Sequence, residues 1–333
     1  MAATGTDVRS EELLPAQHAH DDAGPSRRLT VRRAAVIGTP AAYLVALALT
    51  IANWGLPIAR DQLFFWLALG MLAFSVGRWR TWGWMLLEWA PFFGLLVLYD
   101  VLRGAVAVSP ERAHQGDQIA FDRFFFGHDT PTVWLQDQLW TPAGLHWYDY
   151  AVWVVYMTHF FAVWTVAAVL WRVAHDRFRR FVAVTVLLTL GAFLTYWLYP
   201  AEPPWLAAQD GAIAPVHRIV PAVWGELGVG TVKSVYENAS LVNVVAAMPS
   251  LHAAYPALLF AFFWSSGWRA RVPLGLYTLG MGTVLVYGGE HYVLDIVAGW
   301  AMVGVVFGVV ALATRLWVRR AERVPARATP PTV

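Results

Sequence analysis

Residues Gly288 to Thr314 read GGEHYVLDIVAGWAMVGVVFGVVALAT. The ionisable side chains of this stretch, Glu290, His291 and Asp295, stand at its start, and the remainder is apolar. From His291 onward the stretch is long enough to cross a bilayer as a helix, which takes about 20 apolar residues. Ionisable groups in membrane helices are costly and mark functional sites. The stretch therefore predicts a membrane helix with a functional site at its first turn.

The composition of the whole chain also predicts an integral membrane protein. Of its 333 residues, 58% are hydrophobic and 14% are charged, and 19 are tryptophans. A soluble domain of ordinary composition is far less apolar. The chain has no cysteine, which excludes disulfides and thiolate metal sites.

Eight segments approach the length of a membrane span, so we expect about eight transmembrane helices in an all-α, polytopic bundle. In chain order they are Ala34 to Trp54, Gln62 to Gly77, Trp82 to Ala105, Ala151 to Trp171, Phe181 to Tyr199, His252 to Gly267, Val272 to Gly288 and His291 to Thr314. Residues 1–33 are polar and predict a disordered cytoplasmic tail, and residues 317–333 predict a basic cytoplasmic tail.

Arginines predict which loops face the cytoplasm, because cytoplasmic loops are enriched in Lys and Arg. With the N-terminus inside, most of the 24 basic residues fall on the cytoplasmic side. The few on the outer side are Arg60, Arg103, Arg112, Arg123, Arg218 and Lys233. His252 and His291 are thus expected at the extracytoplasmic face of the cell membrane. The net charge of +2 reflects the arginines that set the membrane orientation and does not indicate nucleic-acid binding.

Two long outer segments, residues 106–150 and 200–251, are expected to contribute to the function, because they are too long to be simple connections. The first contains FDRFFFGHDTPTVWLQDQLW, from Phe121 to Trp140, which predicts an amphipathic helix lying in the headgroup region. An ordinary loop with scattered aromatic residues is the alternative.

His291 and Asp295 are four residues apart, so on a helix they would share a face. The carboxylate would then accept a hydrogen bond from one imidazole nitrogen and fix the tautomer. The other nitrogen would stay unprotonated, as a nucleophile or base requires.

A second histidine follows a helix start in AAMPSLHAAYP, from Ala246 to Pro256. Pro249 and Ser250 fit the residue preferences of a helix N-terminus, where unpaired N–H groups bind anions such as phosphate. His252 would stand beside that phosphate as a proton donor. A lone histidine there is more often a hydrogen-bonded structural residue, and a metal site of His252, His291 and Asp295 is a further alternative.

These motifs carry a family resemblance. MPSLHAAYP and GEHYVLDIVAG, joined by one helical hairpin, resemble the second and third signature motifs of the type 2 phosphatidic acid phosphatase superfamily. Leu251 and the form HYxxD resemble the inositol phosphorylceramide synthase branch, and LYPAEPPWL, from Leu198 to Leu206, resembles its first motif. The resemblance implies a six-helix catalytic core over residues 82–316, with residues 34–81 as two additional helices.

The resemblance also implies a mechanism on the matching positions. His291 would be the nucleophile on phosphorus, Asp295 its orienting carboxylate and His252 the general acid. Water or an alcohol such as inositol would then take the phosphoryl group of a lipid phosphate, with no metal and no cofactor. Residues within or beside the motifs would bind phosphate or substrate: Ser250, Leu251, Tyr199, Glu202, Trp205, Tyr292 and Glu290.

The sequence departs from the family pattern in its positively charged residues. Leu285 stands where the third motif usually has an arginine. An anionic phosphate still needs positive charge, so Arg103 and Arg218 are candidates. The alternatives are a snorkelling membrane anchor for Arg103 and simple solvation in a loop for Arg218. Asp100 and Glu88 lie within a membrane segment and are expected to pair with arginine or to bind substrate hydroxyls. Tyr156 and His159 are expected to form a hydrogen-bonded core pair.

The sequence thus predicts an enzyme that transfers or hydrolyses a lipid-linked phosphate. Transfer of an inositol-type headgroup is the first reading, and plain hydrolysis of phosphatidate or polyprenyl phosphate is the alternative. A proton-coupled transporter is the alternative from another class, but transporters place such groups near the bilayer midplane in repeated halves. Here they gather at one face, and the chain shows no internal repeat.

Overall fold

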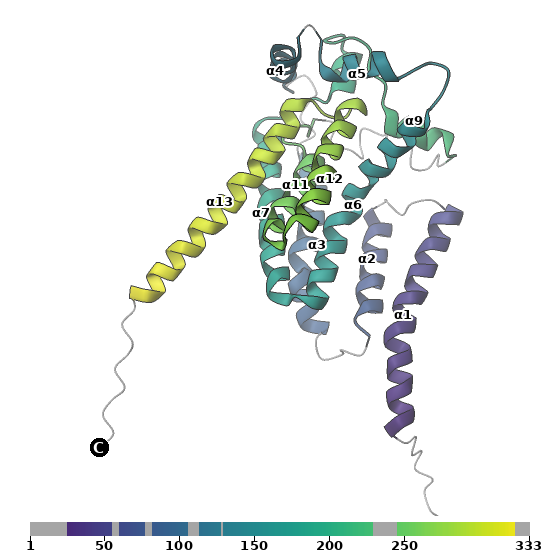
Figure 1. Cartoon of the computed structure of the whole chain (residues 1–333), viewed down its shortest axis with the longest axis vertical. Coiled ribbons are helices and arrows are strands. Elements are labelled where there is room, and N and C mark those ends of the chain that lie inside the picture. Colours follow the sequence, from purple (N-terminus) through teal and green to yellow (C-terminus); the bar gives the residue numbers. More distant parts are fainter. Residues whose placement is uncertain are drawn as a thin grey trace, which may run out of the picture.

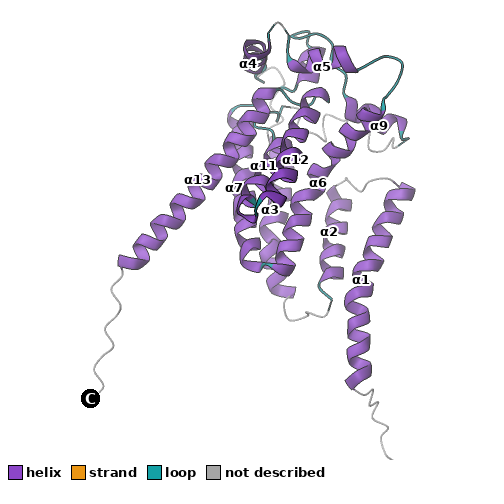
Figure 2. Cartoon of the chain, viewed as in Figure 1, coloured by secondary structure: helices purple, strands orange, loops and turns teal. Residues whose placement is uncertain are grey.

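The computed structural model describes residues 25–54, 60–76, 82–105, 113–127, 129–228 and 245–323. Within these ranges the chain folds into helices and has no β-strand, which confirms the all-α prediction (Figure 2). The helices are α1 (Pro25–Trp54), α2 (Arg60–Phe74), α3 (Trp82–Ala105), α4 (Gly116–Phe126), α5 (Pro131–Leu139), α6 (Trp147–Val173), α7 (His175–Leu198), α8 (Pro204–Gln209), α9 (Ile219–Glu226), α11 (Leu251–Phe262), the 3-10 turn η3 (Trp264–Ser266), α12 (Trp268–Tyr287) and α13 (Val293–Arg323).

Each of the eight expected membrane segments corresponds to a helix, namely α1, α2, α3, α6, α7, α11, α12 and α13. Among the described residues, four stretches are long and apolar enough to cross a membrane by length and composition: Ala34–Asn53, Trp147–Val173, His175–Leu198 and Val293–Arg320. Leu86–Leu95 and Leu251–Phe262 are shorter apolar helical stretches. The chain is therefore a polytopic helical membrane protein.

Several helix ends differ from the expected ones. α1 already begins at Pro25, inside the segment expected to be a tail, and α13 continues to Arg323. Arginine is a good helix former whose long side chain reaches water, so a helix continues beyond the apolar core of the membrane. α13 begins at Val293 rather than at His291, because the chain first turns at Gly289, where φ is +77°. Residues 1–24 and 324–333 lie outside the described part.

The expected interfacial helix is instead a pair of short helices, α4 and α5. Gly127, with φ at +102°, ends α4, and Pro131 starts α5. The left-handed backbone at Gly127 favours glycine and breaks the helix. The stretch is therefore helical, as two short helices rather than a single one, and its place in the headgroup region stays a prediction. Phe124, Phe125 and Phe126 are exposed at the end of α4.

A six-helix core is formed by α3, α6, α7, α11, α12 and α13. One half is an apolar cluster that joins α3, α6, α7, α11 and α13, and it includes Phe92, Phe181, Leu258 and Val303. The other half joins α6, α9, α11, α12 and α13. α1 packs on α2, where the Tyr43 hydroxyl donates to the carbonyl oxygen of Trp66 at 3.1 Å. The interior is thus apolar packing between helices, which dominates folding stability.

The short helices and the arginines lie at opposite ends of the bundle. Figure 1 shows α4, α5 and α9 gathered at the end where α11 and α13 begin. The turns α6–α7 and α11–α12 and the last turns of α13 lie at the other end, and they carry Arg172, Arg177, Arg179, Arg180, Arg269, Arg271, Arg315, Arg319 and Arg320. Glu88 of α3 lies at this arginine-rich end and accepts hydrogen bonds from Trp171 and Arg179, each at 3.1 Å, so its role is a structural pairing.

Candidate active site

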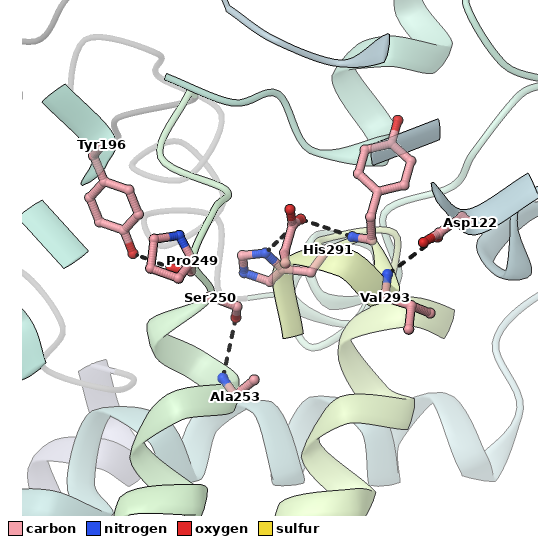
Figure 3. A network of polar contacts seen from close by, with 9 residues as sticks. Asp122, Tyr196, Pro249, Ser250, Ala253, His291 and Val293 are labelled. Atoms are coloured by element: carbon pink, nitrogen blue, oxygen red, sulfur yellow. Dashed lines mark hydrogen bonds and ion pairs between the residues drawn. The ribbon is translucent and has the colours of Figure 1, made fainter. Parts of the chain in front are cut away.

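The start of α11 is fixed by capping and by contact with α13 (Figure 3). The Ser250 hydroxyl caps the helix by accepting from the Ala253 N–H at 3.2 Å, as its position in the sequence predicted. The Ser250 N–H donates to the backbone oxygen of Asp295 at 3.0 Å. The Tyr196 hydroxyl donates to the carbonyl oxygen of Pro249 at 2.8 Å. These contacts hold His252, the second residue of α11, against the start of α13.

Gly299 allows this close approach of α11 and α13. A Cβ atom at this position would lie 2.6 Å from the carbonyl oxygen of Ser250, closer than such atoms approach in proteins. Only glycine therefore lets the two helix starts approach this closely. The sequence analysis gave this glycine no role, because nothing in its local pattern marks the contact.

The start of α13 presents His291 beside a buried carboxylate. His291 Nδ1 lies 3.4 Å from Asp295 Oδ2, and the same oxygen accepts from the Tyr292 N–H at 3.0 Å. The predicted pairing of His291 with Asp295 is present, but its predicted basis was wrong, since His291 precedes the helix. Asp295 reaches back from the first turn of α13 to two residues in the preceding loop. A carboxylate there also interacts favourably with the positive end of the helix.

A second carboxylate reaches the start of α13 from outside the bundle. Asp122 of α4 accepts from the Val293 N–H at 3.2 Å and is fully buried (Figure 3). Burial raises the pKa of Asp122 to about 6, with opposition from its hydrogen bonds to the backbone of α13. The sequence analysis missed Asp122, because its partner is far away along the chain. Asp122 ties α4 to the helix that carries the candidate nucleophile.

His252 faces His291 from the neighbouring helix and is part of an aromatic stack. The ring centroids of His252 and His291 are 5.8 Å apart. His252 stacks between Tyr156, at 4.6 Å, and His159, at 3.8 Å, and His159 stacks in turn on Tyr255 at 5.1 Å. The expectation of a hydrogen-bonded pair of Tyr156 and His159 missed this arrangement, because both rings pack on His252. The stack fixes the plane of the His252 imidazole.

Arg218, Glu290 and Trp205, all predicted site residues, come together next to His291. Arg218 forms a bidentate ion pair with Glu290, with N–O distances of 3.1 and 3.0 Å. Its guanidinium carbon also lies 4.2 Å from the centre of the Trp205 ring. Arg218 is therefore held in place, and simple loop solvation does not describe it. The side chains of Arg103 and Asp100 and all of Arg112 and Lys233 lie outside the described residues.

Gln136 of α5 joins the loop that carries Arg218 to the turn that precedes His291. Its amide donates to the carbonyl oxygens of His217, at 2.8 Å, and Tyr287, at 2.7 Å, and it accepts from the His217 N–H at 2.7 Å. Its side chain is buried. Nothing in the sequence singles out this glutamine, since its partners are far from it along the chain.

The remaining predicted residues border the site on the side of α4 and α8. Tyr199 stacks on His114 with ring centroids 4.0 Å apart, and its hydroxyl donates to Asp117. Burial and Asp117 raise the pKa of Tyr199. Glu202 is buried, which raises its pKa, and Tyr292 is fully buried. Leu251 is partly buried and begins α11.

The described residues do not bring three or more His, Cys, Asp or Glu side chains together in a group that could hold a metal ion. The site instead combines two imidazoles, an orienting carboxylate and a helix N-terminus. Such a set provides a nucleophile, a proton donor and anion-binding N–H groups.

Comparisons with known proteins agree with these motifs. Residues 120–309 match the sequence profile of the PAP2 superfamily. A relative in Bacteroides thetaiotaomicron, named phosphoinositol dihydroceramide synthase, is 32% identical over 128 residues. The matched region is 36% of this chain and 41% of that relative, so it spans less than half of the relative's length. No solved structure matches the chain.

Proposed function

The chain belongs to the PAP2 superfamily, and on that premise we propose that it transfers a lipid phospho-headgroup through a phosphohistidine formed on His291. At the coarser level it is a membrane enzyme, a phosphotransferase or phosphatase of lipid phosphates. The observation that carries the finer proposal is the juxtaposition of His291 with Asp295 on one side and His252 on the other.

In the first step His291 Nε2 attacks the phosphorus, because Nδ1 faces the Asp295 carboxylate at 3.4 Å. The P–O bond to the lipid alcohol breaks, and His252 gives its proton to the departing oxygen. Asp295 stabilises the positive charge that develops on the His291 imidazole. The products of this step are the free lipid alcohol and a phosphohistidine that still carries the headgroup.

In the second step an acceptor hydroxyl attacks the phosphorus, the P–N bond breaks, and the hydroxyl proton returns to His252. The enzyme then has its starting protonation. Alignment and charge stabilisation dominate such transfers. Ser250 and Leu251, at the N-terminus of α11, and Arg218 are the proposed sources of that stabilisation, and Arg103 is a further candidate.

The name of the Bacteroides relative supports a phosphoinositol group as the transferred headgroup and a ceramide-type alcohol as acceptor. Free inositol is an alternative acceptor. With water in place of the alcohol, the same two steps make the enzyme a phosphatase of phosphatidate or polyprenyl phosphate. Tyr199, Glu202, Trp205, Glu290 and Tyr292 are the proposed substrate-binding residues.

The placement of arginines supports an extracytoplasmic site in the cell membrane. Nine arginines, in the α6–α7 and α11–α12 turns and the last turns of α13, lie at the end of the bundle opposite His291. We further propose that residues 82–316 form the catalytic core, with residues 34–81 as an addition to it. The family match over residues 120–309 lies within that core.

The test is to incubate purified protein with phosphatidylinositol and ceramide, and separately with phosphatidate. Lipid products and free phosphate are followed in the presence of EDTA. Transfer predicts an inositol-containing sphingolipid, whereas hydrolysis predicts phosphate release. A ³²P-labelled, acid-labile adduct that disappears in His291→Ala is expected in either case. An adduct that survives this substitution removes His291 from the nucleophile role.

A further inference from the structure

Several buried polar side chains beside the active site have atoms without a hydrogen-bond partner among the described residues. They are the Tyr292 hydroxyl, both amide atoms of Gln118, Asp122 Oδ1 and Glu202 Oε2. All four side chains are less than a tenth exposed. Buried polar groups in folded proteins are nearly always hydrogen-bonded, so this concentration of unpaired atoms requires a partner that the protein itself does not supply.

These side chains surround one place in the fold. The Tyr292 ring packs against Ile119 of α4, Val133 of α5 and Ala207 of α8. Burial raises the pKa of Tyr292, and the carboxylates of Asp295, Asp122 and Glu202 raise it further.

Two further pairs of buried polar side chains are close in the chain to members of this cluster, beside Ile119 on α4 and Val133 on α5. Gln118 and Asp122 are one turn apart on the same face of α4. The hydroxyls of Thr130 and Thr132, at the start of α5, are buried and unpaired too.

This place adjoins the proposed phosphohistidine. Tyr292 directly follows His291, and its N–H donates to the carboxylate that orients His291. Asp122 bonds the next residue, Val293. The unpaired atoms of Tyr292 and Asp122 thus belong to residues that adjoin His291 in the chain or bond the turn that follows it.

The unpaired atoms differ in kind, which selects the chemistry of the ligand. Carboxylate oxygens accept hydrogen bonds, the Gln118 amide both donates and accepts, and the tyrosine and threonine hydroxyls do the same. Vicinal hydroxyls of a polyol pair with both kinds of group. An ammonium headgroup would pair with the carboxylates and leave the Gln118 N–H groups unpaired. Burial raises the pKa values of Asp122 and Glu202 and so favours their uncharged forms. Uncharged carboxyl groups suit a neutral ligand better than a cation.

We propose that Tyr292, Gln118, Asp122 and Glu202 form a polyol subsite that binds the hydroxyls of the transferred headgroup. This inference rests on the proposed function and names the class of headgroup. A free polyol has the same chemistry as a polyol headgroup, so the experiment includes both sources.

The experiment measures binding and turnover separately, so that a failure of catalysis does not hide the subsite. Full-length protein in detergent is dialysed against labelled myo-inositol 1-phosphate, with choline phosphate and free myo-inositol as competitors. The variants are Tyr292→Phe and Gln118→Leu, which remove unpaired polar atoms and keep most of the packing. Tyr43→Phe, at the α1–α2 contact, is the matched control.

We expect inositol 1-phosphate to bind more tightly than choline phosphate to the wild-type protein. Tyr292→Phe and Gln118→Leu should each weaken inositol 1-phosphate about tenfold, while Tyr43→Phe should not. In turnover, their KM for phosphatidylinositol should rise more than their KM for phosphatidate. Competition by free inositol would assign the subsite to a free acceptor as well as to a headgroup.

Equal binding by the two variants and the control would overturn the subsite, as would tighter binding of choline phosphate. Both results are independent of turnover. Absence of any lipid turnover, with polyol binding intact, would instead count against the proposed function alone.

Discussion

The membrane bundle and the group of short helices above it are held together in different ways. The bundle of α3, α6, α7, α11, α12 and α13 is joined by buried apolar side chains. The cap, which we define as α4, α5 and α8 with their connections, is joined to the bundle by a small apolar cluster around Tyr292 and by single polar contacts, such as those of Gln136 and Asp122. The proposed catalytic residues lie in or beside bundle helices and several proposed substrate-binding residues lie in the cap, so the two regions should respond differently to substitution.

The largest effect is expected in the bundle, at the proposed nucleophile. His291→Ala should lower turnover by about a thousandfold or more, because it removes the imidazole that forms the proposed covalent intermediate. Folding should be retained, since His291, although buried, is not part of the apolar clusters that join the bundle helices. Phosphate or lipid product formation is the measurement, with thermal unfolding as the control. Residual activity above a few per cent would assign the nucleophile to another residue.

Asp295→Asn should have the next largest effect, again in the bundle. The amide keeps the shape of the side chain but does not stabilise a positively charged His291, and a comparable change in a Ser-His-Asp triad costs about 10⁴-fold in kcat. The measurement is kcat, and the loss should be in kcat more than in KM. An unchanged kcat would show that the 3.4 Å contact of His291 with Asp295 has no catalytic role.

The two regions also differ in how far the sequence predicts them. The six bundle helices, like α1 and α2, follow from the length of apolar segments, and His252, His291 and Asp295 follow from short motifs. In contrast, the contacts of Gln136 with His217 and Tyr287 join residues that are 81 and 151 positions apart. Local patterns do not encode such partners, and they also hid the break at Gly127. Sequence patterns therefore predict where the apolar helices of the bundle lie in the chain. Only the structure shows the polar contacts of the cap.

Substitution of Gly299 tests whether the packing of the bundle sets the distance between His252 and His291. In Gly299→Ala the new methyl group would meet the Ser250 carbonyl oxygen at 2.6 Å, so α11 and α13 must separate. Overpacking of this kind costs about 1–3 kcal/mol of stability. We expect a lower Tm and about tenfold to hundredfold lower kcat, because small misplacements of catalytic groups are costly.

Gly304→Ala is the matched control for this substitution. It lies in the same helix, and nothing stands within 4 Å of its added methyl group. The control should keep the wild-type Tm and kcat. If both variants behave alike, the close approach at Gly299 is not what positions His252.

A smaller effect is expected from Asp122 in the cap, and it depends on pH. The folded-state pKa of about 6 is above the ordinary aspartate pKa of 3.8, so between these pH values the folded protein holds a proton that the unfolded chain has lost. Stability from this group is therefore greatest at low pH and falls as the pH rises from about 4 to 6. Asp122→Asn, which does not titrate and still offers an oxygen to Val293, should reduce this fall. Thermal unfolding at pH 5 and pH 7 measures it, and an identical pH dependence in both proteins would contradict the assignment.

The smallest effect on activity is expected from labelling that reports the side of the membrane. The chain has no cysteine, so a single one can be introduced at Ala214, which is exposed in the loop between α8 and α9, or at Ala270, near the start of α12. Both positions lie away from the catalytic residues, and both variants should keep wild-type turnover. If the cap faces outward, as the arginines predict, an impermeant maleimide should label Ala214→Cys on intact cells and Ala270→Cys only after permeabilisation. The reverse pattern would place the cap and His291 in the cytoplasm, and the lipid donor and the acceptor would then have to come from that side.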